Sequence, residues 1–188
     1  FGNDARQHRI ENVDAYGASV QATRTSGQHQ LRTGLDLFYN TVVSTAHAED
    51  IVTGQNSPLD TRYPGGDNNQ FHGALYYSHT WEFSPGWILN DGIRVGYSSL
   101  YSSFTDTTFF RFPFTEVSQD NPVYSGSLGL VRTPNETWKY SLLISTGYRV
   151  PNIDDLSKVF ESGAGTLVVP NPELEPEKTF NAEAGISV

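Results

Sequence analysis

Sustained alternation of large apolar side chains with small or polar ones limits the fold of this chain more than any other feature. In residues 137–150 the large apolar side chains fall at even-numbered positions: Trp138, Tyr140, Leu142, Ile144, Tyr148 and Val150. Polar, charged or glycine residues lie between them: Lys139, Ser141, Ser145, Gly147 and Arg149. Successive side chains of a β-strand point to opposite faces, whereas a helix repeats every 3.6 residues. The segment is therefore predicted to be a strand with an apolar outward face and a polar inward face.

Seven segments of this kind predict an all-β fold, an antiparallel meander of about seven strands. The predicted strands cover residues 11–24, 30–44, 71–83, 87–101, 122–132, 137–150 and 178–188. Short turns rich in turn-forming residues alternate with long loops. The turns fall near 25–27, 84–86 and 133–135, and the loops at roughly 47–69, 104–121 and 151–177. Tight turns at one end and long loops at the other are typical of a bacterial outer-membrane barrel.

Composition is compatible with such a barrel and excludes other classes. The three tryptophans, Trp81, Trp87 and Trp138, all lie beside predicted short turns, where an interfacial aromatic girdle is expected. No run of eighteen apolar residues is present, which excludes a transmembrane helix but not barrel strands of about 9–11 alternating residues. Cysteine is absent, so disulfide and thiolate chemistry are excluded. A net charge of -9 without a basic stripe argues against a nucleic-acid partner.

The negative charge is concentrated in the long loops. They contain thirteen acidic residues against three basic ones, Arg62, Arg111 and Lys158. The acidic residues are Glu49, Asp50, Asp60, Asp67, Asp106, Glu116, Asp120, Asp154, Asp155, Glu161, Glu173, Glu175 and Glu177. Two interpretations stay open: ordinary solvated loops, or an acidic outer vestibule that disfavours polyanionic ligands.

The odd number of predicted strands has a consequence for domain organisation. Bacterial single-chain barrels close with an even number of antiparallel strands, and an open set would expose two unpaired edges and an apolar face. The sequence also begins at Phe1 without a signal peptide. We therefore expect residues 1–188 to be a segment of a larger barrel.

Two sequence boxes flank the last predicted loop. They are Tyr148-Arg149-Val150-Pro151-Asn152 and Asn171-Pro172-Glu173-Leu174-Glu175-Pro176-Glu177. Pro151 removes a backbone donor and ends the strand, and the later prolines keep the returning segment extended. In this order the boxes resemble those of TonB-dependent outer-membrane receptors, with Tyr148, Val150 and Glu175 where Phe, Ala and Lys are common. The sequence around and between them is similar to the Bacteroidetes-type branch of that family.

The resemblance implies a barrel of twenty-two strands in the outer membrane, an N-terminal plug inside it and a short box that contacts TonB. Neither the plug nor the box is visible in residues 1–188, which are expected to form one partial barrel domain. The implied function is TonB-energised import of a scarce nutrient. The first candidate for this nutrient is an iron–siderophore or similar metal chelate, and cobalamin, haem or an oligosaccharide are the alternatives. The implied partners are the plug domain of the same full-length chain, TonB, an extracellular small-molecule ligand and the lipid bilayer. Neither catalysis nor a cofactor is expected.

The motif residues are interpreted as structural, because they set loop-to-strand geometry: Tyr148, Arg149, Pro151, Asn152, Asn171, Pro172, Leu174, Pro176 and Glu177. Arg149, inward at its strand end, is alternatively a contact for the plug or a ligand. An aromatic loop run either grips an apolar or planar ligand or packs neighbouring loops together. It comprises Phe109, Phe110, Arg111, Phe112 and Phe114.

Other candidate chemistry is weaker. His47, with Glu49 and Asp50 or with His72 across the loop, has the donor types of a metal site, and ordinary polar roles are the alternative. No histidine lies between the two boxes, which weakens a haem assignment. No Gly-x-Ser-x-Gly nucleophile motif is present. A second functional class stays open, a soluble β-rich adhesin or carbohydrate-binding module that buries its apolar faces in a sandwich.

Overall fold

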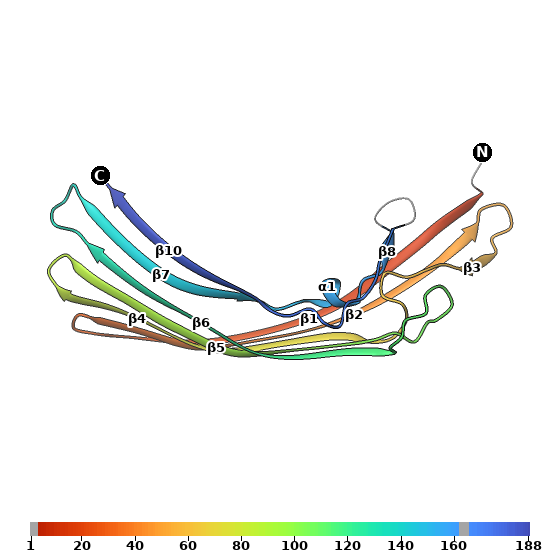
Figure 1. Ribbon diagram of the computed structural model, residues 1–188, viewed down its shortest axis with the longest axis horizontal. Coiled ribbons are helices and arrows are strands. Elements are labelled where there is room, and N and C mark those ends of the chain that lie inside the picture. The colour runs from red at the N-terminus through yellow and green to blue at the C-terminus, as the bar shows by residue number, and fades with distance from the viewer. Residues whose placement is uncertain (1–3, 162–165) are drawn as a thin grey trace.

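The computed structural model describes residues 4–161 and 166–188, with the backbone alone at 160 and 161. Seven long strands form one antiparallel meander in the order β1-β2-β4-β5-β6-β7-β10 (Figure 1). They are β1 (Ala5–Ser26), β2 (His29–Asp50), β4 (Asn68–Ser84), β5 (Trp87–Ser103), β6 (Glu116–Arg132), β7 (Lys139–Arg149) and β10 (Glu177–Ser187). All seven predicted strands are thus confirmed.

Four short elements lie in the long connections. Strand β3 (Asn56–Pro58) pairs with β2, while β8 (Phe160–Glu161) and β9 (Leu167–Val168) pair with each other. Helix α1 (Ile153–Ser157) follows β7. No helix in the described part of the chain is long and apolar enough to cross a membrane.

The strands extend further toward the long-loop end than alternation predicted. Strands β1 and β2 have 22 residues each, and β4, β5 and β6 have 17. Five of the acidic residues predicted to lie in loops are therefore within the long strands, toward their loop ends: Glu49, Asp50, Glu116, Asp120 and Glu177. Alternation fails there because polar residues occupy both faces, while backbone pairing continues regardless of side-chain polarity.

The register assigns the two faces of the curved sheet. Leu35, Leu75, Val95 and Tyr124 lie opposite one another on four adjacent strands, and Leu75 is 61% exposed. The neighbouring row on the other face is Gly34, Tyr76, Arg94 and Ser125. Figure 1 shows α1 lying on the concave side. Ser157 of α1 contacts Ser102, which lies on the same face of β5 as Arg94, so the polar row is concave and the apolar row convex, as alternation predicted.

The convex face has an apolar band bounded by aromatic residues. Beside the short turns, Trp81 contacts Phe83, which contacts Trp87, with ring centroids 5.5 and 6.0 Å apart. On the same face of β5, Tyr97 follows Trp87 by ten residues. At about 3.3 Å per residue and a tilt near 40°, ten residues rise about 25 Å, the height of an outer-membrane apolar band.

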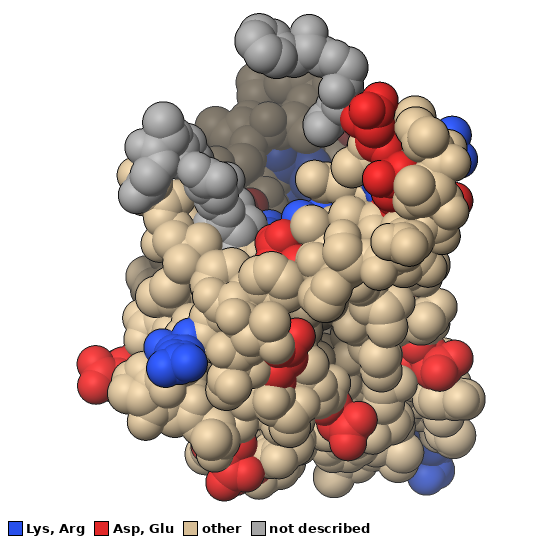
Figure 2. All heavy atoms as spheres, turned by 90° about the vertical axis from the view of Figure 1, so that its right-hand side faces the viewer, with Lys and Arg blue, Asp and Glu red and all other residues tan. Residues whose placement is uncertain are grey.

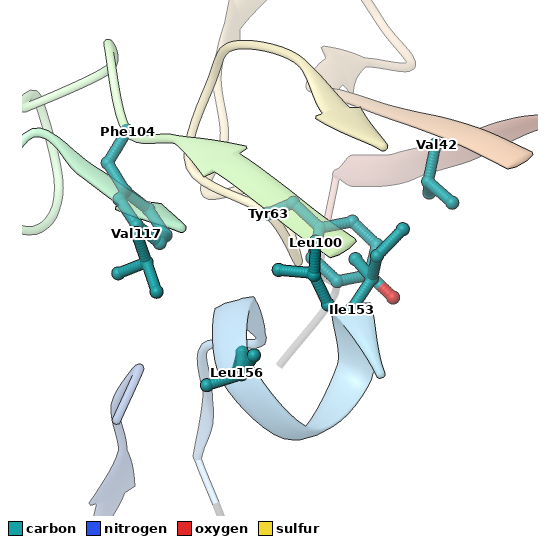
Figure 3. Close-up of a cluster of buried hydrophobic side chains, with 7 residues drawn as sticks. All are labelled: Val42, Tyr63, Leu100, Phe104, Val117, Ile153 and Leu156. Atoms are coloured by element: carbon teal, nitrogen blue, oxygen red, sulfur yellow. The ribbon is translucent and has the colours of Figure 1, made fainter. Parts of the chain in front are cut away.

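The buried core lies on the concave side, at the long-loop end (Figure 3). It consists of Val42, Tyr63, Leu100, Phe104, Val117, Ile153 and Leu156, flanked by Phe112, Phe114 and Leu174. The α1 residue Leu156 is fully buried. Beside it, the Ser157 hydroxyl donates to Ser102 Oγ at 2.5 Å. The third long connection is thus folded back onto the strands and covers their concave ends.

Candidate functional site

An ion-pair clamp holds the two sequence boxes together at the rim. Antiparallel pairing places Glu177 of β10 opposite Arg149 of β7. Arg149 Nη1 donates to Glu177 Oε1 at 3.1 Å, and Nη2 donates to Asp155 Oδ2 at 2.6 Å. The Arg149 guanidinium therefore joins the end of β7, the start of β10 and helix α1.

Asn152 starts α1 through a reciprocal cap. Its Oδ1 accepts from Asp155 N at 2.9 Å, while Asp155 Oδ2 accepts from Asn152 N at 3.0 Å. This satisfies two donors that a helix start leaves unpaired. Before the cap, buried Pro151 accepts at its carbonyl from Gln70 Nε2 at 3.2 Å. A five-residue helix is too short to persist alone, so the cap and its packing define its position.

The second box is fixed mainly through its backbone. Asn171 Oδ1 accepts from Glu173 N at 3.0 Å, closing a tight turn. Gln119 of β6 donates from Nε2 to the carbonyls of Pro172 at 3.2 Å and Leu174 at 2.6 Å. Pro176 immediately precedes β10, and Tyr148 of β7 pairs with Lys178. The structure thus places the two boxes at the two ends of one connection.

The aromatic run is divided between buried and exposed side chains. Phe104 contacts Phe112 and Phe114 edge-on, each with ring centroids 5.5 Å apart. Phe110 stacks on Phe112 at 6.3 Å, whereas Phe109 is 44% exposed. Arg111, between the stacked rings in sequence, is also exposed. Phe112 and Phe114 pack loops together, and Phe109 and Arg111 keep surface that a ligand can reach.

Charged residues of three separate segments meet beside α1. Arg62 Nη2 donates to Asp154 Oδ2 at 2.8 Å, and its Nη1 lies 3.5 Å from Glu11 Oε1. The Tyr63 hydroxyl also donates to Asp154. Burial and this hydrogen bond both raise the pKa of Tyr63, so the phenol stays protonated at physiological pH. Sequence reasoning missed this cluster, because nothing local links positions 62 and 154.

Acidic side chains surround the long-loop end (Figure 2). Strand residues neutralise part of that charge, since Arg9 Nη2 donates to Asp60 Oδ1 at 2.8 Å and Arg149 pairs with Asp155 and Glu177. The side chain of Glu161 lies outside those described. The rim is acidic, but less so than a count over loops alone indicates.

The candidate histidine metal pair does not assemble. His47 lies opposite His8 on the convex face, with the two rings stacked at 4.6 Å. His72 lies opposite Phe38. It is an odd number of residues from Leu75 of the convex row, so its side chain lies on the concave face. His8 Nε2 is 3.0 Å from Glu49 Oε2. Within residues 4–161 and 166–188, no group of three His, Cys, Asp or Glu could hold a metal ion.

Comparison with known proteins gives a consistent result. Residues 1–187 match the family model described as TonB dependent receptor-like, beta-barrel. No curated protein matches. Among solved structures, the copper transporter OprC superposes with a TM-score of 0.77 at 16% identity, covering 96% of this chain and 28% of that one.

Two further solved structures share the fold. A double mutant of the Serratia marcescens hemophore receptor HasR, in complex with its hemophore HasA and heme, gives a TM-score of 0.69 at 17% identity, covering 95% of this chain and 30% of HasR. The Ferric-Catecholate import receptor Fiu from E. coli K12 gives a TM-score of 0.56 at 14% identity, covering 96% of this chain and 29% of Fiu.

The chain therefore spans less than a third of each of these neighbours. Its exposed apolar convex face suits lipid and not the buried sandwich of a soluble adhesin. The chain belongs to the TonB-dependent receptor β-barrel family, whose members are integral β-barrels of the bacterial outer membrane.

Proposed function

We propose that residues 1–188 are a partial barrel domain of an active-transport receptor that binds and imports a metal chelate, with an iron–siderophore as the first candidate. A plug and a TonB-contacting box would belong to the rest of the protein, and TonB would supply the energy. The proposed source is a bacterium of the Bacteroidetes type, because the sequence around the two boxes resembles that branch of the family. The barrel segment supplies vestibule contacts and a polar lumen wall.

The observation that carries the proposal is the arrangement of the loop end on the concave side. Helix α1 and the Phe104–Phe114 cluster pack there, and Phe109 and Arg111 in the same connection as this cluster stay exposed. A planar or apolar ligand shell suits an exposed aromatic ring and an exposed guanidinium two residues apart in one loop. The acidic rim disfavours polyanions, so a chelate of low negative charge is the preferred form of cargo.

Metal-containing cargo is also what the structural neighbours are named for, namely copper, heme and a ferric catecholate. Cobalamin, haem and oligosaccharides remain the alternatives for this chain. No histidine lies between Pro151 and Asn171, which favours a siderophore over haem.

Uptake in a strain that lacks the gene for the full-length protein tests the proposal. A panel of chelates carrying labelled iron is supplied with and without an uncoupler of TonB energisation. Loss of energised uptake of at least one chelate is expected, and unchanged uptake of every chelate would overturn the proposal. Phe109→Ala should weaken binding of that chelate roughly 2–10-fold, as for one aromatic contact. The control Phe180→Ala removes a ring that is 73% exposed on the convex face and should leave binding unchanged.

A further inference from the structure

A polar cluster interrupts the apolar convex face beside the short turns. His29 Nδ1 lies 3.0 Å from His79 Nε2, and His79 Nδ1 lies 2.9 Å from Asp91 Oδ1. The register places the cluster on the convex face, since Trp81 lies opposite His29 and Leu89, and His79 lies opposite Leu31 and Asp91. His29 is the first residue of β2 after the turn. The hydrogen-bonded chain therefore runs along the lipid-facing surface at the level of the tryptophans.

The position of Asp91 requires such a chain. On the same face of β5 it lies between Leu89 and Ile93, and Leu128 faces it from β6. A carboxylate among apolar side chains is unfavourable unless it is paired and hydrogen-bonded. His79, only 15% exposed, gives that partner. The imidazole of His29 then extends this row of hydrogen bonds from His79 to the short turn before β2.

Proton counting determines what His29 offers to a ligand. With both imidazoles neutral, His79 donates to Asp91 and accepts from His29, which leaves His29 Nε2 without a proton. One added proton, on either ring, makes His29 Nε2 an N–H donor while both existing bonds remain. Anion binding at His29 Nε2 is therefore coupled to uptake of one proton.

Arg24 and Trp81 complete the surroundings of His29. Arg24 lies opposite Leu31 on the convex face, so it is a diagonal neighbour of His29, with about 7–8 Å between the two positions. In the described part of the chain its guanidinium has no ion pair or hydrogen bond. The Trp81 ring stacks on His29 at 5.3 Å. With one added proton on the histidines, Arg24, His29, His79 and Asp91 together carry a net charge of about +1, which matches one phosphodiester.

We propose that Arg24 and the His29–His79–Asp91 chain form a binding site for the phosphate of a phospholipid in the periplasmic leaflet. Arg24 and His29 Nε2–H donate to the phosphate oxygens, Trp81 lies against the glycerol region, and the acyl chains follow the convex face past Leu31 and Leu35. The site has no part in cargo recognition, because it lies at the short-turn end of the strands. Its test is therefore independent of the transport proposal.

Lipid retention by the full-length receptor tests the site. The purified protein is incubated with phosphatidylglycerol, and native mass spectrometry counts retained lipid at pH 5.5 and 8. Wild type should retain more lipid at pH 5.5 than at pH 8, because binding at His29 Nε2 takes up one proton. Arg24→Gln and His29→Gln should each reduce retention about tenfold, the loss of one charge-assisted hydrogen bond, and His29→Gln should also remove the pH dependence.

The matched control is Arg32→Gln, which removes a guanidinium from the concave face of the same strand, opposite Thr23. It should retain phosphatidylglycerol like wild type. Diacylglycerol with the same acyl chains should be retained about tenfold less, and inorganic phosphate should not displace the lipid. Equal retention of both lipids, displacement by free phosphate, or an unchanged His29→Gln variant would each refute the site. Heat-dependent gel mobility identifies any variant that fails to fold, and the other single variant then decides.

Discussion

Truncating Leu156 should release α1 from the barrel wall without unfolding the barrel. The Leu156 side chain is fully buried and packs in the cluster with Leu100, Tyr63 and Ile153. Leu→Ala in a packed core costs about 2–5 kcal/mol. A short helix on the edge of its core relaxes more easily than a central one, so about 2–3 kcal/mol is expected at this position.

Amide exchange in the full-length receptor measures the effect. If α1 opens locally without global unfolding, a loss of 2–3 kcal/mol should speed exchange at residues 153–159 by roughly 30–150-fold. Exchange in the β4–β5 ladder should not change, because those hydrogen bonds do not depend on α1.

Leu142→Ala is the matched control for this truncation. Leu142 is 58% exposed on the convex face, so the same change leaves no cavity and should not alter exchange in α1. The reasoning fails if the exchange rates of residues 153–159 in Leu156→Ala stay within about threefold of wild type, or if Leu142→Ala raises them equally.

Three further substitutions test the packing of the barrel wall and the charges at the long-loop end. Gly96→Ala should destabilise the barrel by about 1–3 kcal/mol, because an added Cβ would lie 2.7 Å from Gly73 O and 2.9 Å from Ala74 Cβ. Gly126→Ala, whose nearest contact would be 3.4 Å, should be tolerated in the same thermal gel-shift assay. Arg149→Gln should raise amide exchange in α1 only slightly, because the guanidinium is half exposed and its ion pairs are screened by solvent, and 1 M salt should reduce that rise further. The Thr108 N–H donates to Asp106 and lowers the pKa of that carboxyl below 3.8. The stabilisation that this hydrogen bond gives the loop is therefore present above pH 3.8, and it is lost as the pH falls through the lower pKa of the folded state. Asp106→Asn should abolish this pH dependence, measured as amide exchange in the loop after correction for the intrinsic exchange rate.

Alternation predicted the strands and their faces because the convex surface must be apolar wherever it meets lipid. The same physics explains where prediction stopped. Beyond the apolar band both faces of β2 are polar, so residues 45–50 gave no periodic signal although they pair with β1. Backbone hydrogen bonding alone extends the strand there.

Helix α1 could have been predicted, because Asn152 and Asp155 have the spacing of a capping box and Ile153 and Leu156 share one helical face. The site could be predicted only in part. The aromatic run was recognisable in sequence, but its division into a packed Phe112 and an exposed Phe109 depends on Phe104, which lies in a different part of the connection. The contact of Arg62 with Asp154 joins residues 92 apart in sequence, and no local pattern encodes it.

The contacts of the two sequence boxes explain why they identify the family without identifying the cargo. Arg149 is engaged by Asp155 and Glu177, Asn152 by the α1 backbone, and Asn171 by Glu173 N. Side chains with their hydrogen-bonding groups occupied in this way fix the connection but offer little to a ligand. On the proposed function, discrimination between cargoes would come instead from exposed side chains of the separate β5–β6 connection, with Phe109 and Arg111 as the candidates. Substituting Phe109 and Arg111 should change which chelate is bound. Arg149→Lys should instead loosen α1 and so weaken the binding of every chelate to the same extent.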